Sequence, residues 1–425
     1  MKSTSLLVSV FFALALPCAA IPNSVIGPVF GANSPLNGQD LTDQVLGKKL
    51  WQGEGRLPGE WVDEGTVGSS AQAHLLARPK LFDREVLLLR STEREGRLAQ
   101  LEATFVDAGS FFGYFDDKLP EGLTRRQMEE EMAMRLAAKQ EEFRAGYEET
   151  LASLRETISE TADKPKPKVV RFGKGRMLRV EPEEWKKDGL LIRLFAAENR
   201  LIRLTISPEG EESDGWLAPG LEEESARARL ARYQSSVSRE KGAVHVEGIK
   251  TVPQGYKPYC GLNTLAMAAR HLGMMLDEDW MAVAAGFQNT GSAGGSNMVK
   301  LYHAVAAEAG VSLDRSSKFD LATVRKSLEN GLPVVVWRRF SHERNRLHDK
   351  FASDPEAILP DPAMVDESST WPGDDAPLHA SVITGYDALR NEIFFLESWS
   401  NHDRTRRMRV EEMAATTYLC FAFLP

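Results

Sequence analysis

Cys260 stands where a cysteine gains chemical reactivity. It follows a loop rich in proline and glycine, and it begins a run whose apolar residues recur at helical spacing. The first turn of a helix exposes backbone N–H groups and the positive end of the helix dipole, which favour a thiolate. A nucleophilic thiolate also needs a base that takes and returns its proton, and histidine suits that task near neutral pH. The eight histidines of the sequence are therefore the candidates for this base.

His379 has the surroundings that fit this role best. It opens an apolar run of residues, and a second apolar run returns after a polar turn, which predicts a hairpin centred near residue 388. In that register residue 379 faces residue 397, so Glu397 is expected to hydrogen-bond the imidazole and fix its tautomer. His271 is excluded as the base, because it follows Cys260 on the same helix at about 16 Å along the axis.

No motif in the sequence indicates a metal or a cofactor. His342 and His348 lack the four-residue spacing with which a helix presents two zinc ligands. Glycine patterns that bind phosphate or dinucleotides do not occur. We therefore expect chemistry that uses side chains alone, with no cofactor.

The elements that position these residues follow from hydrophobic periodicity and from proline and glycine breaks. A helix is predicted from Cys260 to Gly273, because the apolar residues between them lie on one helical face. The other predicted helices span residues 124–162, 221–235 and 298–309. Strands are predicted at residues 85–90, 98–106, 190–195, 201–206, 244–252, 333–337, 379–386, 392–399 and 418–424.

Length and charge limit the class of protein. The chain has 425 residues and a net charge of −9, which gives room for two or three domains and argues against nucleic-acid binding. Lys2, an apolar stretch over residues 6–16 and small residues up to Ala20 predict a signal peptide at residues 1–20. The protein is thus expected to be exported to the periplasm or the medium, without stable membrane insertion after cleavage.

Cleavage after residue 20 would leave two cysteines, Cys260 and Cys420. They could form a disulfide, or one could be a functional thiol and the other a buried one. Cys420 lies in an apolar final run and is expected to be buried and inert. The mature chain divides into a mixed α/β region at residues 21–240, whose role the sequence does not show, and a region at residues 243–425 that carries the candidate chemistry.

The order of motifs in residues 243–425 resembles the papain-like cysteine peptidases. Gln254-Gly255, then Cys260 opening a helix, then His379 and finally Glu397-Ser-Trp399 look like the bacterial branch related to bacteriocin-processing (double-glycine leader) peptidases. The resemblance implies an α+β fold with a C-terminal papain-like domain. It also implies that Cys260 is the nucleophile, His379 the base and acid, Glu397 the orienting group and Gln254 an oxyanion donor. The substrate would be a peptide or protein.

Two residues depart from the pattern of that family. Glu397 occupies the place of an Asn or Asp and is one methylene longer than Asp, and Ser400 replaces a glycine. Two other functions remain open: an amidase or acyl transferase that acts on cell-wall peptides with the same Cys–His–Glu site, and an inactive binding module. Residues 21–240 could form an inhibitory pro-region, or could position the substrate or the cell envelope.

Overall fold

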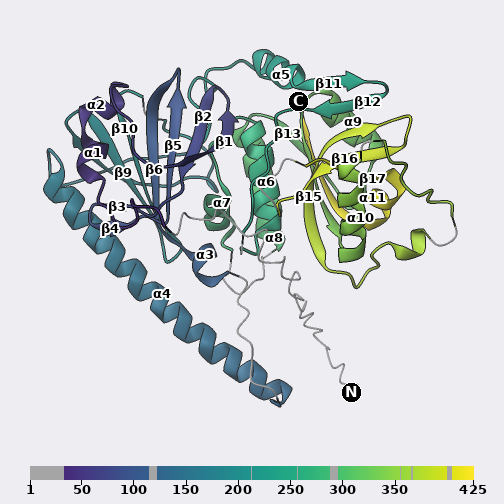
Figure 1. Ribbon diagram of the computed structural model, residues 1–425, viewed down its shortest axis with the longest axis horizontal. Coiled ribbons are helices and arrows are strands. Elements are labelled where there is room, and N and C mark those ends of the chain that lie inside the picture. Colours follow the sequence, from purple (N-terminus) through teal and green to yellow (C-terminus); the bar gives the residue numbers. More distant parts are fainter. Residues whose placement is uncertain are drawn as a thin grey trace, which may run out of the picture.

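A computed structural model describes residues 33–113, 122–211, 213–255, 257–287, 295–354, 356–364, 367–399 and 404–425. The predicted signal peptide and Ser400 lie outside these residues. Mixed helix and sheet content is present throughout, organised around two large sheets that lie on opposite sides of the molecule (Figure 1). No helix among the described residues combines the length and apolar character that a membrane span requires.

The first sheet is antiparallel and has eight strands within the described residues. In spatial order they are β1 (Trp61–Val67), β2 (Ser70–Leu75), β5 (Leu88–Arg94), β6 (Arg97–Asp107), β10 (Leu201–Pro208), β9 (Leu190–Ala197), β8 (Glu183–Lys187) and β7 (Lys168–Val169). The strands predicted at 98–106, 190–195 and 201–206 are confirmed. Smaller elements beside this sheet are α1 (Thr42–Leu46), α2 (Lys48–Trp51), β3 (Lys80–Leu81), β4 (Arg84–Glu85) and α3 (Ala108–Phe112).

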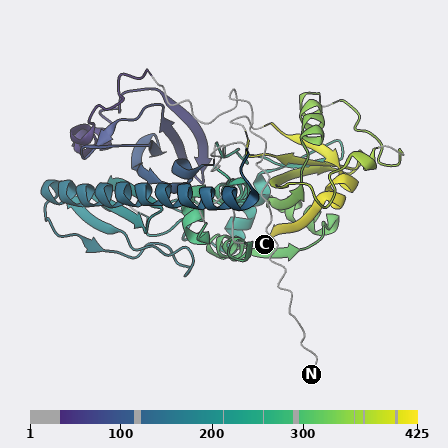
Figure 2. The ribbon, with the colours of Figure 1, turned by 90° about the horizontal axis from the view of Figure 1, so that it is seen from below.

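The long helix predicted over residues 124–162 is confirmed as α4 (Arg125–Thr161). Thr124 and Gln127 form a capping box that satisfies the first backbone N–H groups of the helix. Its buried residues Tyr147, Leu154 and Ile158 join the core of the first sheet. Figure 2 shows α4 extending along this half of the molecule.

The second sheet is also antiparallel, with eight strands within the described residues. Its main order is β11 (Val237–Glu240), β12 (Ala243–Val246), β15 (Leu378–Asp387), β14 (Val334–Arg339), β18 (Thr417–Leu424) and β13 (Ser312–Ser316). Strand β16 (Glu392–Leu396) pairs with β15 and with β17 (Arg406–Arg409). This sheet begins at Val237, slightly before the domain start expected from the sequence.

Helices surround the second sheet. They are α5 (Ala226–Ser235), α6 (Cys260–His271), α7 (Glu278–Ala285), α8 (Gly295–Glu308), α9 (Leu321–Glu329), α10 (His342–Ser353), the 3₁₀ turn η2 (Ser368–Thr370) and α11 (Val410–Thr416). The helix predicted over 221–235 starts later than expected, because Ser225 caps it by accepting from the N–H of Ala228. The strand predicted over 244–252 ends at Val246, and Gly248 then takes a φ of +81°, which is incompatible with a regular strand.

The two sheets are joined by a shared hydrophobic cluster, although the first sheet also has a core of its own. Trp280 on α7 contacts Phe195 of β9 and Trp216, with ring centroids 5.5 Å apart in both pairs. The same buried cluster continues through α6 to Phe421 of β18. Helices α6 and α7 stand between the sheets in Figure 1, so α6 is held from both sides.

Two arginines of β17 anchor a stretch of chain that has no regular structure. Arg407 donates to the carbonyl oxygens of Asp354 and Ala357 at 2.7 and 3.0 Å. Arg409 donates to the carbonyl oxygens of Leu359 and Pro360 at 2.7 and 3.1 Å. These guanidinium groups therefore take the place of the backbone partners that a helix or strand would supply.

Candidate active site

Cys260 is the first residue of α6, as predicted, and the residue is partly exposed. The helix forms because Leu262, Leu265 and Ala269 are fully buried against β14 and β15. It ends before Gly273, whose φ of +90° no longer fits a helix. Residues 262–269 are all buried, so packing on every side fixes the axis of α6 and with it the position of Cys260 in the first turn.

His379 and Glu397 are in direct contact, as the sequence analysis expected. The Nε2 atom of His379 lies 2.6 Å from Oε2 of Glu397, and both residues are buried. Burial alone would raise the pKa of Glu397, but the neighbouring His379 and Arg338 outweigh it and lower that pKa to about 2. Burial also lowers the pKa of His379, and Glu397 offsets only part of this effect. The carboxylate is therefore charged and the imidazole tends towards its neutral form.

The strand register that predicted this contact is wrong by two residues. The ladder pairs Asp387 with Glu392 and Val382 with Leu396, and a bulge lies between Ile383 and Gly385. The turn thus centres later than residue 388, and Ser381 is the position nearest to Glu397 across the strands. Glu397 reaches His379 along the diagonal, which its extra methylene relative to aspartate makes possible.

Two further residues hold Glu397, and the sequence analysis missed both. Arg338 Nη2 donates to Oε1 of Glu397 at 2.6 Å, and Ser381 Oγ donates to the same oxygen at 3.0 Å. Arg338 is 2% exposed and lies opposite His379 in the β14–β15 ladder. The signal was present in the sequence, because a charge directly after the apolar run Val334–Trp337 needs a buried partner.

Aromatic rings enclose the imidazole of His379. Trp399 stacks on it with centroids 4.1 Å apart and planes at 27°, and Phe340 lies 5.6 Å away. The Nδ1 atom of His379 is buried and has no hydrogen-bond partner among the described residues. Because Nε2 is taken by Glu397, Nδ1 is the nitrogen that remains for chemistry.

A chain of contacts ties the start of α6 to the strand beside His379. The hydroxyl of Tyr302 donates to the carbonyl of Gly261 at 3.0 Å and accepts from Nε1 of Trp337 at 3.2 Å. Trp337 pairs with Ala380, the residue after His379. The residues flanking Cys260 and His379 are therefore joined through Trp337.

Gln254 lies in the loop before Cys260 and is 3% exposed. Ser398 holds it twice: the Gln254 N–H donates to the Ser398 carbonyl at 2.8 Å, and the Ser398 hydroxyl donates to Oε1 of Gln254 at 2.8 Å. Its Nε2 donates to the carbonyl of Lys257 at 3.2 Å. This arrangement fixes which end of the amide carries the N–H donors, and it connects the loop to the residue after Glu397.

Cys420 differs from Cys260 in its exposure and in its place in the fold. It is a free thiol on β18, 4% exposed, and burial raises its pKa to about 12. A thiol with such a pKa forms almost no thiolate at neutral pH. The expectation of a buried Cys420 is therefore confirmed, and the two cysteines are not joined.

Comparison with known proteins supports a peptidase-like C-terminal region. Residues 246–422 match the family model described as the Peptidase_C39 like family. Among solved structures, a candidate C39-like peptidase from Bacillus anthracis is 14% identical, with 43% of this chain and 98% of that chain covered and a TM-score of 0.29. A search of curated proteins gave no match. Through the family match, the C-terminal region of this chain is similar to the C39-like peptidases, which are papain-like cysteine peptidases.

Proposed function

We propose that the protein is a cysteine peptidase in which Cys260 is the nucleophile. The observation that carries the proposal is the buried His379–Glu397 pair, whose remaining imidazole nitrogen is Nδ1, beside a helix that begins with a partly exposed cysteine. A thiol, an imidazole and a carboxylate in this order are the groups that covalent acyl transfer requires. The family match points to the same reaction class.

The proposed reaction has two halves. Nδ1 of His379 takes the proton of Cys260 while Sγ attacks the carbonyl carbon of the peptide bond. The amine leaves with that proton, and a thioester remains on Sγ. Water then attacks the thioester and gives a proton to Nδ1, which returns it to the sulfur as the carboxylic acid departs.

The other residues support the charges that develop. Glu397 keeps Nε2 protonated and stabilises the imidazolium, while Arg338 and Ser381 keep the carboxylate in place. The backbone N–H of Cys260 and the amide of Gln254 would donate to the oxyanion. Such donors act most strongly when they are already oriented before the reaction, and Ser398 orients Gln254 in this way.

The finer assignments extend this proposal. The resemblance to bacteriocin-processing peptidases suggests a substrate with a double-glycine leader. A peptide with such a leader should therefore be among the substrates assayed. The apolar N-terminal stretch supports export, with cleavage after Ala20. Sequencing the N-terminus of the protein recovered from the medium or periplasm would test the export.

The decisive experiment compares the two thiols. An epoxysuccinyl inhibitor should add its mass to Cys260 and not to Cys420, because the latter has a raised pKa and is buried. Cys260→Ala should abolish peptide hydrolysis, and Cys420→Ala should retain it. Equal activity in both variants, or loss in the Cys420 variant alone, would exclude Cys260 as the nucleophile and the peptidase function with it.

A further inference from the structure

The turn that carries Gln254 ends at Lys257, and the side chain of Lys257 reaches both α7 and the end of β6 in the first sheet. The N–H of Lys257 donates to the carbonyl of Gln254 at 3.0 Å, which closes the turn, and Gly255 takes a φ of +56° within it. The carbonyl of Lys257 also accepts the hydrogen bond from the Gln254 amide. The position of Lys257 therefore determines where the proposed oxyanion donor lies.

Lys257 is anchored by a carboxylate of the first sheet. Its Nζ atom lies 2.7 Å from Asp107 Oδ2 and 2.6 Å from Asp279 Oδ1. Asp107 is the last residue of β6, and Asp279 is on α7. Burial would lower the pKa of Lys257, but these carboxylates raise it well above its usual value. A half-buried ammonium of this kind depends on its partners, because an unpaired charge in this position is costly.

A second contact joins the same two segments beside the thiol. Tyr259, which precedes Cys260, is 2% exposed and packs over Gly109 of α3. A Cβ on Gly109 would lie 2.5 Å from the Tyr259 hydroxyl oxygen, a distance that real contacts do not tolerate. Residues 107–109 thus bind Lys257 through an ion pair and Tyr259 through close packing.

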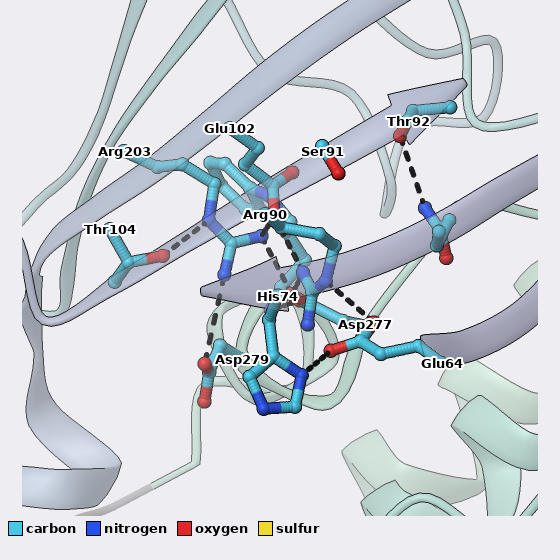
Figure 3. Close-up of polar contacts among 12 residues, drawn as sticks. Glu64, His74, Arg90, Ser91, Thr92, Glu102, Thr104, Arg203, Asp277 and Asp279 are labelled. Atoms are coloured by element: carbon cyan, nitrogen blue, oxygen red, sulfur yellow. Dashed lines mark hydrogen bonds and ion pairs between the residues drawn. The ribbon is translucent and has the colours of Figure 1, made fainter. Parts of the chain in front are cut away.

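The support behind this contact is a continuous network of buried charges (Figure 3). Arg203 of β10 lies 2.8 Å from Asp277, which caps α7, and Arg90 of β5 contacts Asp277 at 3.3 Å and Glu64 at 2.8 Å. Arg270 of α6 donates to the backbone carbonyl of Glu64 at 2.9 Å. Both helices next to the turn are therefore tied to the strands of the first sheet.

We propose that the first sheet is a positioning element of the peptidase site, acting through Asp107 on Lys257 and through Gly109 on Tyr259. These contacts set the turn that carries Gln254 and the residue that precedes Cys260. The inference rests on the proposed function, and it assigns to the N-terminal half a supporting role in the reaction. An inhibitory pro-region would have the opposite effect on activity.

The test uses full-length variants that change one contact at a time. Asp107→Asn removes the charge by which the first sheet binds Lys257 and leaves the Asp279 contact in place, and asparagine can still cap α3. Its control is Glu102→Gln, which alters the same charge network at Arg90 and does not contact Lys257. Gly109→Ala places a methyl group against Tyr259, and its control is Gly146→Ala, a helical position with nothing within 4 Å of the added carbon.

Two measurements on folded protein decide the outcome: kcat and KM for a peptide, and the rate of Cys260 alkylation by iodoacetamide. We expect Asp107→Asn and Gly109→Ala to lower kcat about 10- to 100-fold with little change in KM, because the oxyanion donor acts in the transition state. Both controls should keep wild-type values. Lys257→Arg should retain more activity than Lys257→Met, since a guanidinium group can still bind Asp107.

Several results would overturn the proposal. Unchanged kcat in folded Asp107→Asn and Gly109→Ala, or higher kcat than wild type, contradicts a supporting role. An equal loss in Glu102→Gln would mean that the effect is general destabilisation. If the wild type hydrolyses no peptide, the proposed function fails separately, and the alkylation rate alone decides: a change in the two test variants and not in their controls supports positioning, and no change refutes it.

Discussion

Two buried carboxylates have nearly the same partners: Glu397, which follows β16, and Glu412 of α11. Each is hydrogen-bonded by the Nε2 of a histidine, His379 at 2.6 Å and His348 at 3.0 Å, and each also binds an arginine. Although burial opposes it, their partners lower both glutamate pKa values to about 2. Burial lowers the pKa of both histidines, and both Nδ1 atoms lack a partner among the described residues.

The surroundings of the two clusters differ. His379 is stacked on Trp399 beside the strand that contacts the start of α6, whereas His348 lies on α10 with its ring against Phe395 of the core. Any buried His–Glu–Arg cluster can therefore show shifted pKa values and an imidazole nitrogen without a partner. These two features by themselves do not identify a catalytic site. The nearby helix that begins with a thiol is what distinguishes the His379 cluster.

The largest expected difference comes from removing each histidine. His379→Ala should reduce kcat by roughly 10²–10⁴-fold or more, because the thiol loses its proton acceptor. His348→Ala should leave kcat within a few-fold of wild type and should lower the free energy of unfolding, since a buried carboxylate loses one donor. Steady-state kinetics and urea denaturation of both variants measure this, and a comparable loss of kcat in His348→Ala would make the clusters functionally equivalent.

The loop beside His379 should matter next. Gln254→Ala should lower kcat by about 10²–10³-fold with little change in KM, as expected for an oxyanion donor. Gln72→Ala is the matched control, because it removes a buried amide from β2 in the first sheet. If the two variants have equal kcat, the amide of Gln254 does not contact the developing charge.

The two carboxylates can be separated by the pH dependence of the reaction. Glu397 raises the pKa of His379, so Glu397→Gln should move the limb of the pH–rate profile that reports the His379 proton to lower pH. Glu412→Gln should leave that limb unmoved. The loss of maximal rate should be mild, because a glutamine oxygen can still accept from Nε2. A shift in the Glu412 variant would show that the profile reports global stability.

A third histidine, the half-buried His271, has no carboxylate at hydrogen-bond distance and extends the comparison. Nε2 of His271 lies 2.7 Å from the carbonyl of Gly331, and burial lowers the pKa of His271 to about 4. The unfolded chain then binds more protons between pH 6.5 and 4, so stability falls as pH decreases through that range. Between pH 7.5 and pH 5, the free energy of unfolding should fall by about 2 kcal/mol more in the wild type than in His271→Gln. Denaturation of both proteins at the two pH values measures this difference. An equal fall in the free energy of unfolding in both proteins would mean that folding does not keep His271 neutral.

The sequence predicts the parts of the site that depend on short-range patterns. The start of α6 follows from the loop and the apolar face after it, and the His379–Glu397 contact follows from two strands and a turn. The register was off by two residues because a bulge and the exact turn depend on packing that a pattern does not contain. The roles of Arg338 and Lys257 were missed for a different reason. Their partners are distant in the chain, and the sequence pattern does not indicate which distant residue pairs with a given charge.

The arginines of β17 have a consequence for how this protein can vary. Arg407 and Arg409 bind the main-chain oxygens of Asp354, Ala357, Leu359 and Pro360, and every residue type supplies such an oxygen. Ile358, which lies between these anchors, is 86% exposed. Exposed side chains such as Ile358 can therefore be exchanged while the path of the main chain stays constant, whereas Leu359, which is 3% exposed, is constrained by burial.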